Sequence, residues 1–93
     1  MELILIDYNL QKIIQKLNDK KIRTMDCCEG HFEDLKPNIY ISFLNKIKSA
    51  PDEFKIENEK VIRHIYKSKT KKEFEKEKER MIKNIEEWID KTG

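Results

Sequence analysis

The chain has 93 residues, which is enough for one domain with a small core and too few for two domains. Charged residues make up 41% of it and hydrophobic residues 38%, but the hydrophobic residues are grouped and periodic, so we expect a folded chain rather than a disordered one. The 20 basic and 18 acidic residues nearly cancel, and no basic stripe stands out, which argues against nucleic acid as a partner.

The two cysteines, Cys27 and Cys28, are adjacent, and neighbouring cysteines rarely bridge each other because the bond would be strained. We find no signal peptide, so a reduced, cytoplasmic protein is the simplest interpretation. No apolar run approaches the roughly 20 residues of a membrane span, and we expect no membrane partner. A homodimer would compensate for the thin core of so short a chain.

The chain opens with a predicted strand followed by a predicted helix. Residues 1–6 contain four consecutive apolar residues and fit a buried strand, although they could also open the helix that follows. The helix is predicted by apolar residues spaced three and four apart, namely Leu10, Ile13, Ile14 and Leu17. Asp7 or Asn9 would cap its start, and Asn18 or Asp19 would end it in a left-handed conformation.

Alternating apolar residues predict three further strands, at residues 22–28, 39–44 and 61–66. Regular alternation in the first of them would put Thr24 and Asp26 on the same face as Cys28, with Cys27 on the opposite face. Residues 45–60 predict a polar connection. This connection would be attached to the core by its two bulky apolar residues, Phe54 and Ile56.

Residues 68–92 predict a long helix. Thr70 and Glu73 have the spacing of a capping box. The buried stripe consists of Phe74, Met81, Ile82, Ile85, Trp88 and Ile89, with the stem of Lys78 filling a gap. Together the elements predict one α+β domain over residues 1–93, in the order β-α-β-β-β-α, with one small sheet covered by two helices.

The segment from Arg23 to Asp34 is the best candidate for a binding site. It holds both cysteines, one of the two histidines and the only internal glycine, which would supply a positive φ or a close approach. Backbone N–H groups at such a strand end can hold an anion, while an arginine from a neighbouring strand pairs with it and a tyrosine offers a stacking face. The predicted ligand-binding residues are Cys28, Glu29, Gly30, His31, Tyr40 and Arg63.

A metal site is the first alternative for the same segment. The soft-metal ligands of the chain are Cys27, Cys28, His31 and His64, and zinc takes three or four such groups. However, adjacent residues of an extended strand point to opposite faces, so both thiols rarely reach one ion. We therefore expect no cofactor, with zinc as the alternative.

A metal- or thiol-dependent enzyme that uses Cys28 and His31 is the second alternative. A nucleophilic thiol needs a lowered pKa and an orienting partner. The carboxylates around this segment would instead raise a thiol pKa. A purely structural interpretation also stands, in which one cysteine packs in the core and Arg63 pairs with Glu57 or Glu59.

Residues 17–24, the Cys27-Cys28-Glu29-Gly30-His31 segment and residues 39–43 together resemble a family of short uncharacterised proteins. These occur in bacteriophages and mobile elements of low-GC Gram-positive bacteria, and their mark is a strand that ends in Cys-x-Gly-His. Ile62-Arg63, Lys67-Ser68-Lys69 and the Glu/Lys helix that ends near Trp88 fit the same pattern. The resemblance implies an anti-defence role, such as that of an anti-CRISPR protein or of a protein that sequesters a nucleotide signal. We expect a non-enzymatic binding module that binds a host protein or a small anionic or nucleotide ligand at the Cys28-Glu29-Gly30-His31 turn.

Overall fold

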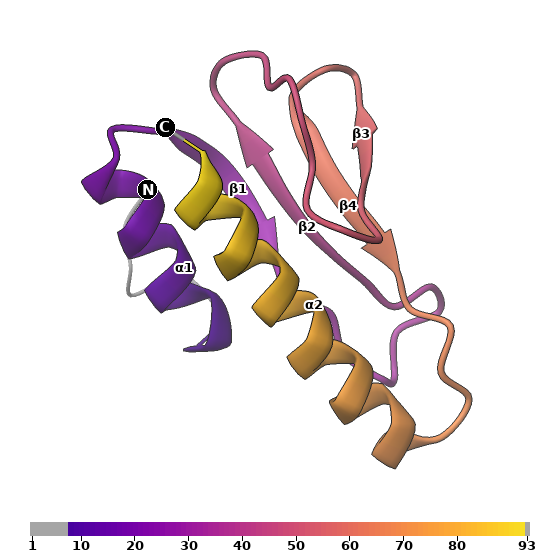
Figure 1. The fold of residues 1–93 in the computed structure, drawn as a ribbon. Coiled ribbons are helices and arrows are strands. Elements are labelled where there is room, and N and C mark those ends of the chain that lie inside the picture. The colour runs from indigo at the N-terminus through magenta and orange to yellow at the C-terminus, as the bar shows by residue number, and fades with distance from the viewer. Residues whose placement is uncertain (1–7, 93) are drawn as a thin grey trace.

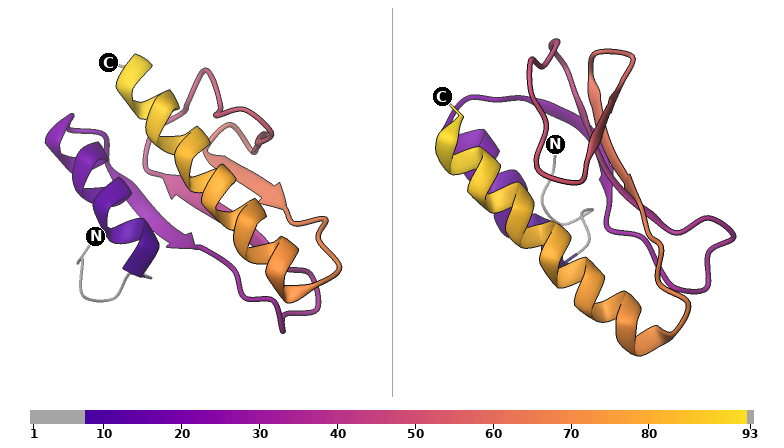
Figure 2. Two further views of the ribbon diagram at one scale, coloured as in Figure 1. Left: turned by 60° about the horizontal axis from the view of Figure 1, so that its bottom comes forward. Right: turned by 45° about the vertical axis from the view of Figure 1, so that its right-hand side comes forward.

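The computed structural model describes residues 8–92, which form two helices and four strands (Figure 1). In chain order these are α1 (Tyr8–Asp19), β1 (Thr24–Cys28), β2 (Asn38–Phe43), β3 (Lys55–Glu57), β4 (Val61–Ile65) and α2 (Lys71–Lys91). The strands form one antiparallel sheet in the order β1-β2-β4-β3. Both helices lie side by side on the same face of this sheet, and the other face is open (Figure 2).

The predicted α+β class, with two helices covering one small sheet, is confirmed, whereas the order of elements differs. The strand predicted for residues 1–6 lies outside the described residues. Residues 45–60, predicted as a polar connection, contain the additional strand β3. The turn into β4 has positive φ at Asn58 and Glu59, and the Lys60 N–H donates to the Glu57 carbonyl at 3.1 Å, as in a type I′ turn.

Helix α1 ends in a Schellman motif whose left-handed residue is Lys21, with φ of 62°. The Lys21 N–H donates to the Asn18 carbonyl, and the Ile22 N–H donates to the Leu17 carbonyl, both at 2.9 Å. The prediction of a left-handed Asn18 or Asp19 was therefore wrong, because the helix continues through both. Likewise Asn9 lies inside α1 rather than at its cap, and Asp7 lies outside the described residues.

Strand β1 carries an irregularity at Met25 that reverses the predicted alternation. Thr24 pairs with Phe43 of β2, but the next paired residue is Asp26, opposite Ser42. Thr24 therefore faces the core and is 8% exposed, while Asp26 lies on the open face. The prediction that they share a face was wrong. Cys27 and Cys28 do point to opposite faces, as predicted, because they pair with Ile41 and Tyr40 respectively.

The core lies between the sheet and the two helices. The predicted apolar face of α1 and most of the predicted stripe of α2 are buried, and so is the predicted Lys78 stem, whereas Ile82 and Trp88 are half-buried. Phe54 packs into the core as expected, but Ile56 is 40% exposed on the edge strand and does not. The predicted cap of α2 is confirmed, because the Thr70 side chain accepts a hydrogen bond from the Glu73 N–H at 3.2 Å.

Candidate functional site

Three of the predicted site residues form one row across the open face of the sheet. Cys28 pairs with Tyr40 in the register of β1 and β2, and Tyr40 pairs with Arg63 in that of β2 and β4. The Arg63 guanidinium carbon lies 4.8 Å from the centre of the Tyr40 ring, which is a cation–π contact. The row thus brings together side chains from three strands that are far apart in the sequence.

The charges of this row are already compensated by neighbours. Arg63 donates to Glu57 at 2.9 Å and to Asn38 at 2.6 Å, so the predicted pairing with Glu57 is present. The Tyr40 hydroxyl donates to Asp26 at 2.8 Å. Burial and this bond to a carboxylate raise the pKa of Tyr40 to about 12, so the hydroxyl stays protonated at neutral pH. Tyr40 and Arg63 are therefore already paired within the open face.

The turn after β1 is packed against its neighbours. Gly30 has φ of 83°, as predicted, and a side chain there would collide with the Asn38 carbonyl and the Tyr66 ring. The Tyr66 hydroxyl donates to the Glu29 carbonyl at 2.7 Å. The Glu29 side chain is buried, and its carboxylate lies 3.9 Å from the Lys78 ammonium. The glycine therefore serves a close approach between backbone segments.

His31 lies at the exposed end of the same turn. Its backbone N–H donates to the Asp34 carboxylate at 3.0 Å, and its carbonyl accepts from the Asp34 N–H at the same distance. This N–H is thus engaged within the chain and is not presented to an anion. His31 is also not among the residues that line the cavities described below.

Three of the four candidate metal ligands are distributed over both faces of the sheet, and the fourth, His31, lies in the turn after β1. Cys27 and His64 belong to the face covered by the helices, whereas Cys28 lies on the open face. Neither cysteine forms a disulfide. Among residues 8–92 there is no group of three or more His, Cys, Asp or Glu side chains placed to hold a metal ion.

His64 takes part in a buried hydrogen-bond network between β4 and α2. Its Nε2 lies 2.6 Å from the Glu77 carboxylate, and its Nδ1 lies 2.9 Å from the Glu53 carbonyl oxygen. Glu77 also accepts hydrogen bonds from the Lys67 and Ser68 N–H groups and from the Ser68 hydroxyl. Burial by itself raises the pKa of Glu77, but the bonds from Ser68, His64 and Lys67 outweigh it and hold that pKa below its ordinary value.

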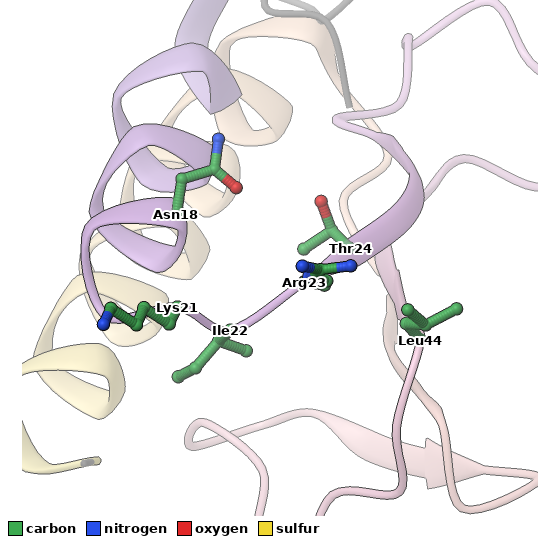
Figure 3. A pocket seen from close by; sticks show the side chains of 6 residues that line it. All are labelled: Asn18, Lys21, Ile22, Arg23, Thr24 and Leu44. Atoms are coloured by element: carbon green, nitrogen blue, oxygen red, sulfur yellow. The ribbon is translucent and has the colours of Figure 1, made fainter.

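Two adjoining cavities open where α1 leads into β1, and we call them together the basic groove. The first, of about 540 Å³, is lined by Asn18, Lys21, Ile22, Arg23, Thr24 and Leu44 (Figure 3). The second, of about 350 Å³, shares the segment Lys21–Arg23 and extends over the loop after β2 to the end of α2. Figure 3 shows this shared segment running from the last turn of α1 to β1, with Leu44 opposite.

The lining of the basic groove is strongly cationic. It contains Lys21, Arg23, Lys46 and Lys48, and none of the described residues that line it is acidic. Lys46 pairs with Glu59 at 3.0 Å, whereas the other three form no ion pair with a described residue. Other cavities mix the two signs: one beside β3, of about 500 Å³, has Glu53 and Glu57 next to Arg63 and Lys67.

One wall of the second cavity is aromatic. Phe43 and Trp88 meet edge to face, with ring centres 6.0 Å apart. The Trp88 indole N–H donates to the Ser49 hydroxyl at 2.9 Å, which ties α2 to the loop after β2 and fixes the ring. Phe43 is 1% exposed, whereas Trp88 is half-buried and belongs to the lining of this cavity. The sequence predicted that Trp88 would pack in the core or lie at a dimer interface, and its spacing did not indicate a place in a cavity wall.

Lys20 prepares the groove electrostatically. Its ammonium donates to the Ile89 and Thr92 carbonyls at 2.5 and 2.7 Å, where α2 ends. The carbonyls at a helix C-terminus carry partial negative charge that would repel an anion. Because Lys20 compensates this charge, the end of α2 does not oppose the binding of an anion at the neighbouring groove.

No family model matches the chain, and no curated protein or solved structure matches it either. Within residues 8–92, neither helix has the length and apolar character that crossing a membrane requires. The fold and the groove therefore define only a structural class, which is an α+β domain with an open antiparallel sheet and a cationic groove at one end.

Proposed function

We propose that the protein is a small binding module without chemistry of its own and that its ligand is an anion held in the basic groove. The observation that supports this is the lining of the groove, which has four basic residues and no acidic one among the described residues, in a chain whose charges nearly balance. A concave site of one sign concentrates field lines and raises the local concentration of the opposite charge. Arg23 in particular offers the planar fork that suits phosphate and carboxylate groups.

The groove suits an anion better than the predicted turn does. At the turn, Arg63 is neutralised by Glu57, and the His31 N–H is occupied by Asp34. In the groove, Arg23 and Lys48 have no such partner among the described residues. A bound anion would therefore gain new interactions there instead of replacing existing ones.

Titration with inorganic pyrophosphate, followed by calorimetry and by amide chemical shifts, tests this proposal. We expect shift changes centred on residues 18–24 and 44–49, and Arg23→Gln should weaken binding at least about tenfold, since a hydrogen bond to a charged group contributes roughly 1.5–3 kcal/mol. Lys72→Gln is the matched control, because Lys72 is exposed at the far end of α2. Absence of binding, or an equal loss in both variants, would contradict the proposal.

The biological setting comes from the resemblance to phage and mobile-element proteins. It suggests an anti-defence protein that removes a host molecule from use by binding it. Expression of the protein in a bacterium with an active defence system should then restore phage plating, and Arg23→Gln should abolish the effect while Lys72→Gln keeps it. Restoration by Arg23→Gln to the same level would separate any such role from the groove.

A further inference from the structure

We infer that the anion is a free nucleotide, with its phosphates against the Lys21–Arg23 segment and its base against Trp88. This inference rests on the proposed function and adds the non-ionic part of the ligand. It starts from the composition of the second cavity, where the cations adjoin an apolar, aromatic wall. An inorganic anion would use only the cations.

The wall is suited to a flat ring. Trp88 is held by its bond to Ser49 and by its edge-to-face contact with Phe43, so its orientation is set before a ligand arrives. Ile47 lies in the same lining and extends the apolar surface. Stacking of a base on a fixed aromatic ring tolerates any base, because every base has a π face.

Polar groups around the wall can serve the edge of a base. Asn45, Ser49 and Thr92 line the same cavity, and Asn45 can both donate and accept hydrogen bonds. The cavity of about 350 Å³ is within the range of small-ligand sites, and the adjoining one leaves room for phosphates beside Asn18 and Thr24. The groove therefore offers aromatic, polar and cationic groups together, which are the kinds of group that contact a base, a ribose and a phosphate.

Trp88 makes the inference directly measurable, because it is the only tryptophan in the chain. ATP and inorganic tripolyphosphate would be titrated without divalent metal, each followed by calorimetry and by tryptophan fluorescence. We expect ATP to bind at least about fivefold more tightly than tripolyphosphate, because base stacking adds to the phosphate contacts. We also expect ATP, but not tripolyphosphate, to quench the fluorescence strongly.

The variant Trp88→Leu separates the two halves of the ligand. Its affinity for ATP should fall to that for tripolyphosphate, whereas its affinity for tripolyphosphate should stay within about twofold of the unaltered protein, since leucine keeps the apolar wall without the stacking face. If that variant does not fold, the comparison of ATP with tripolyphosphate on the unaltered chain decides the question alone.

The outcomes distinguish the inference of a nucleotide ligand from the proposed anion-binding function on which it rests. Equal affinities for ATP and tripolyphosphate, without quenching, would overturn the nucleotide and leave the anion site standing. Failure of both to bind would overturn both. Tighter binding of a six-nucleotide oligodeoxyadenylate than of ATP would overturn the assignment to a free nucleotide in favour of a single strand.

Discussion

At the scale of single residues, Glu77 is the side chain on which the packing of α2 against the sheet most depends. Glu77 is 5% exposed, and its carboxylate accepts hydrogen bonds from His64, from two backbone N–H groups and from the Ser68 hydroxyl. Glu77→Gln should lower the free energy of unfolding by about 3 kcal/mol, because it replaces the buried carboxylate that accepts these hydrogen bonds with a neutral amide, half of which is a donor. Urea denaturation would measure this, with the exposed Glu79→Gln as a control that changes stability by less than about 0.5 kcal/mol.

The contribution of Glu77 to the free energy of unfolding should also depend on pH. The pKa of Glu77 is below its ordinary value of 4.5 in the folded state, so its contribution is complete above that value. As the pH falls through the lower, folded pKa, Glu77 becomes protonated and the contribution disappears. The stability difference between the unaltered protein and Glu77→Gln should therefore be constant from pH 7 to 5 and shrink below pH 4.5. A difference that persists unchanged at pH 3 would rule out this role.

Gly30 leads to a second prediction at this scale. Its φ of 83° is strained for any other residue, and a methyl group there would meet the Asn38 carbonyl and the Tyr66 ring. Gly30→Ala should lower the free energy of unfolding by about 2 kcal/mol or more, yet leave pyrophosphate affinity unchanged in the folded fraction. Thermal denaturation and calorimetry would test the two halves. Selective loss of ligand binding at unchanged stability would return the site to the turn.

At the scale of elements, the end of α1 contains a residue, Lys21, that has a strained backbone conformation and also lines the proposed anion site. Lys21 takes φ of 62°, a conformation in which glycine is most at ease, and it lines both cavities of the groove. Lys21→Gly should therefore raise the free energy of unfolding by about 1 kcal/mol and weaken pyrophosphate binding severalfold. Urea denaturation and calorimetry on one sample would show both effects.

Asn58→Gly is the matched control, because Asn58 also has a positive φ, of 50°, but bears no charge and lies in the turn between β3 and β4. It should gain some stability without any change in anion affinity. Equal affinities for the Lys21→Gly variant and the unaltered chain would remove Lys21 from the groove's function.

The sequence predicted the elements in which apolar side chains recur at the spacing of a helix or a strand. Both helices and strands β2 and β4 repeat Ile, Leu, Phe or Val at the right spacing. Strand β3 has one apolar residue, and its turn uses Asn58 and Glu59 where a glycine would have been the recognisable signal. The irregularity at Met25 shifts β1 by one residue, which no alternation pattern reveals.

The candidate site was less predictable than the fold for a related reason. The row of Cys28, Tyr40 and Arg63 follows from strand alternation and register, so the sequence could bring these residues together. The basic groove combines Arg23, Lys48 and Trp88, which belong to three separate segments, and each looks ordinary in its own segment. They are neighbours only because the end of α1, the loop after β2 and the end of α2 pack against one another.

At the scale of the whole molecule, the charged residues are distributed unevenly, although the net charge is small. The chain carries a formal charge of +2, so long-range attraction of an anion to the molecule as a whole is weak. Binding at the groove must then depend on short-range interactions with the local cations. Salt reduces such interactions as the screening length falls from about 10 Å at 0.1 M to about 3 Å at 1 M.

This distribution leads to a prediction about ionic strength. The dissociation constant for pyrophosphate should rise about tenfold between 50 and 500 mM sodium chloride, because the screening length falls below the span of the groove. Arg23→Gln should show a shallower dependence, since it removes one of the screened contacts, while Lys72→Gln should keep the full slope. Calorimetric titrations at four salt concentrations would give the three slopes. An affinity independent of salt would contradict the binding of pyrophosphate through the cations of the groove.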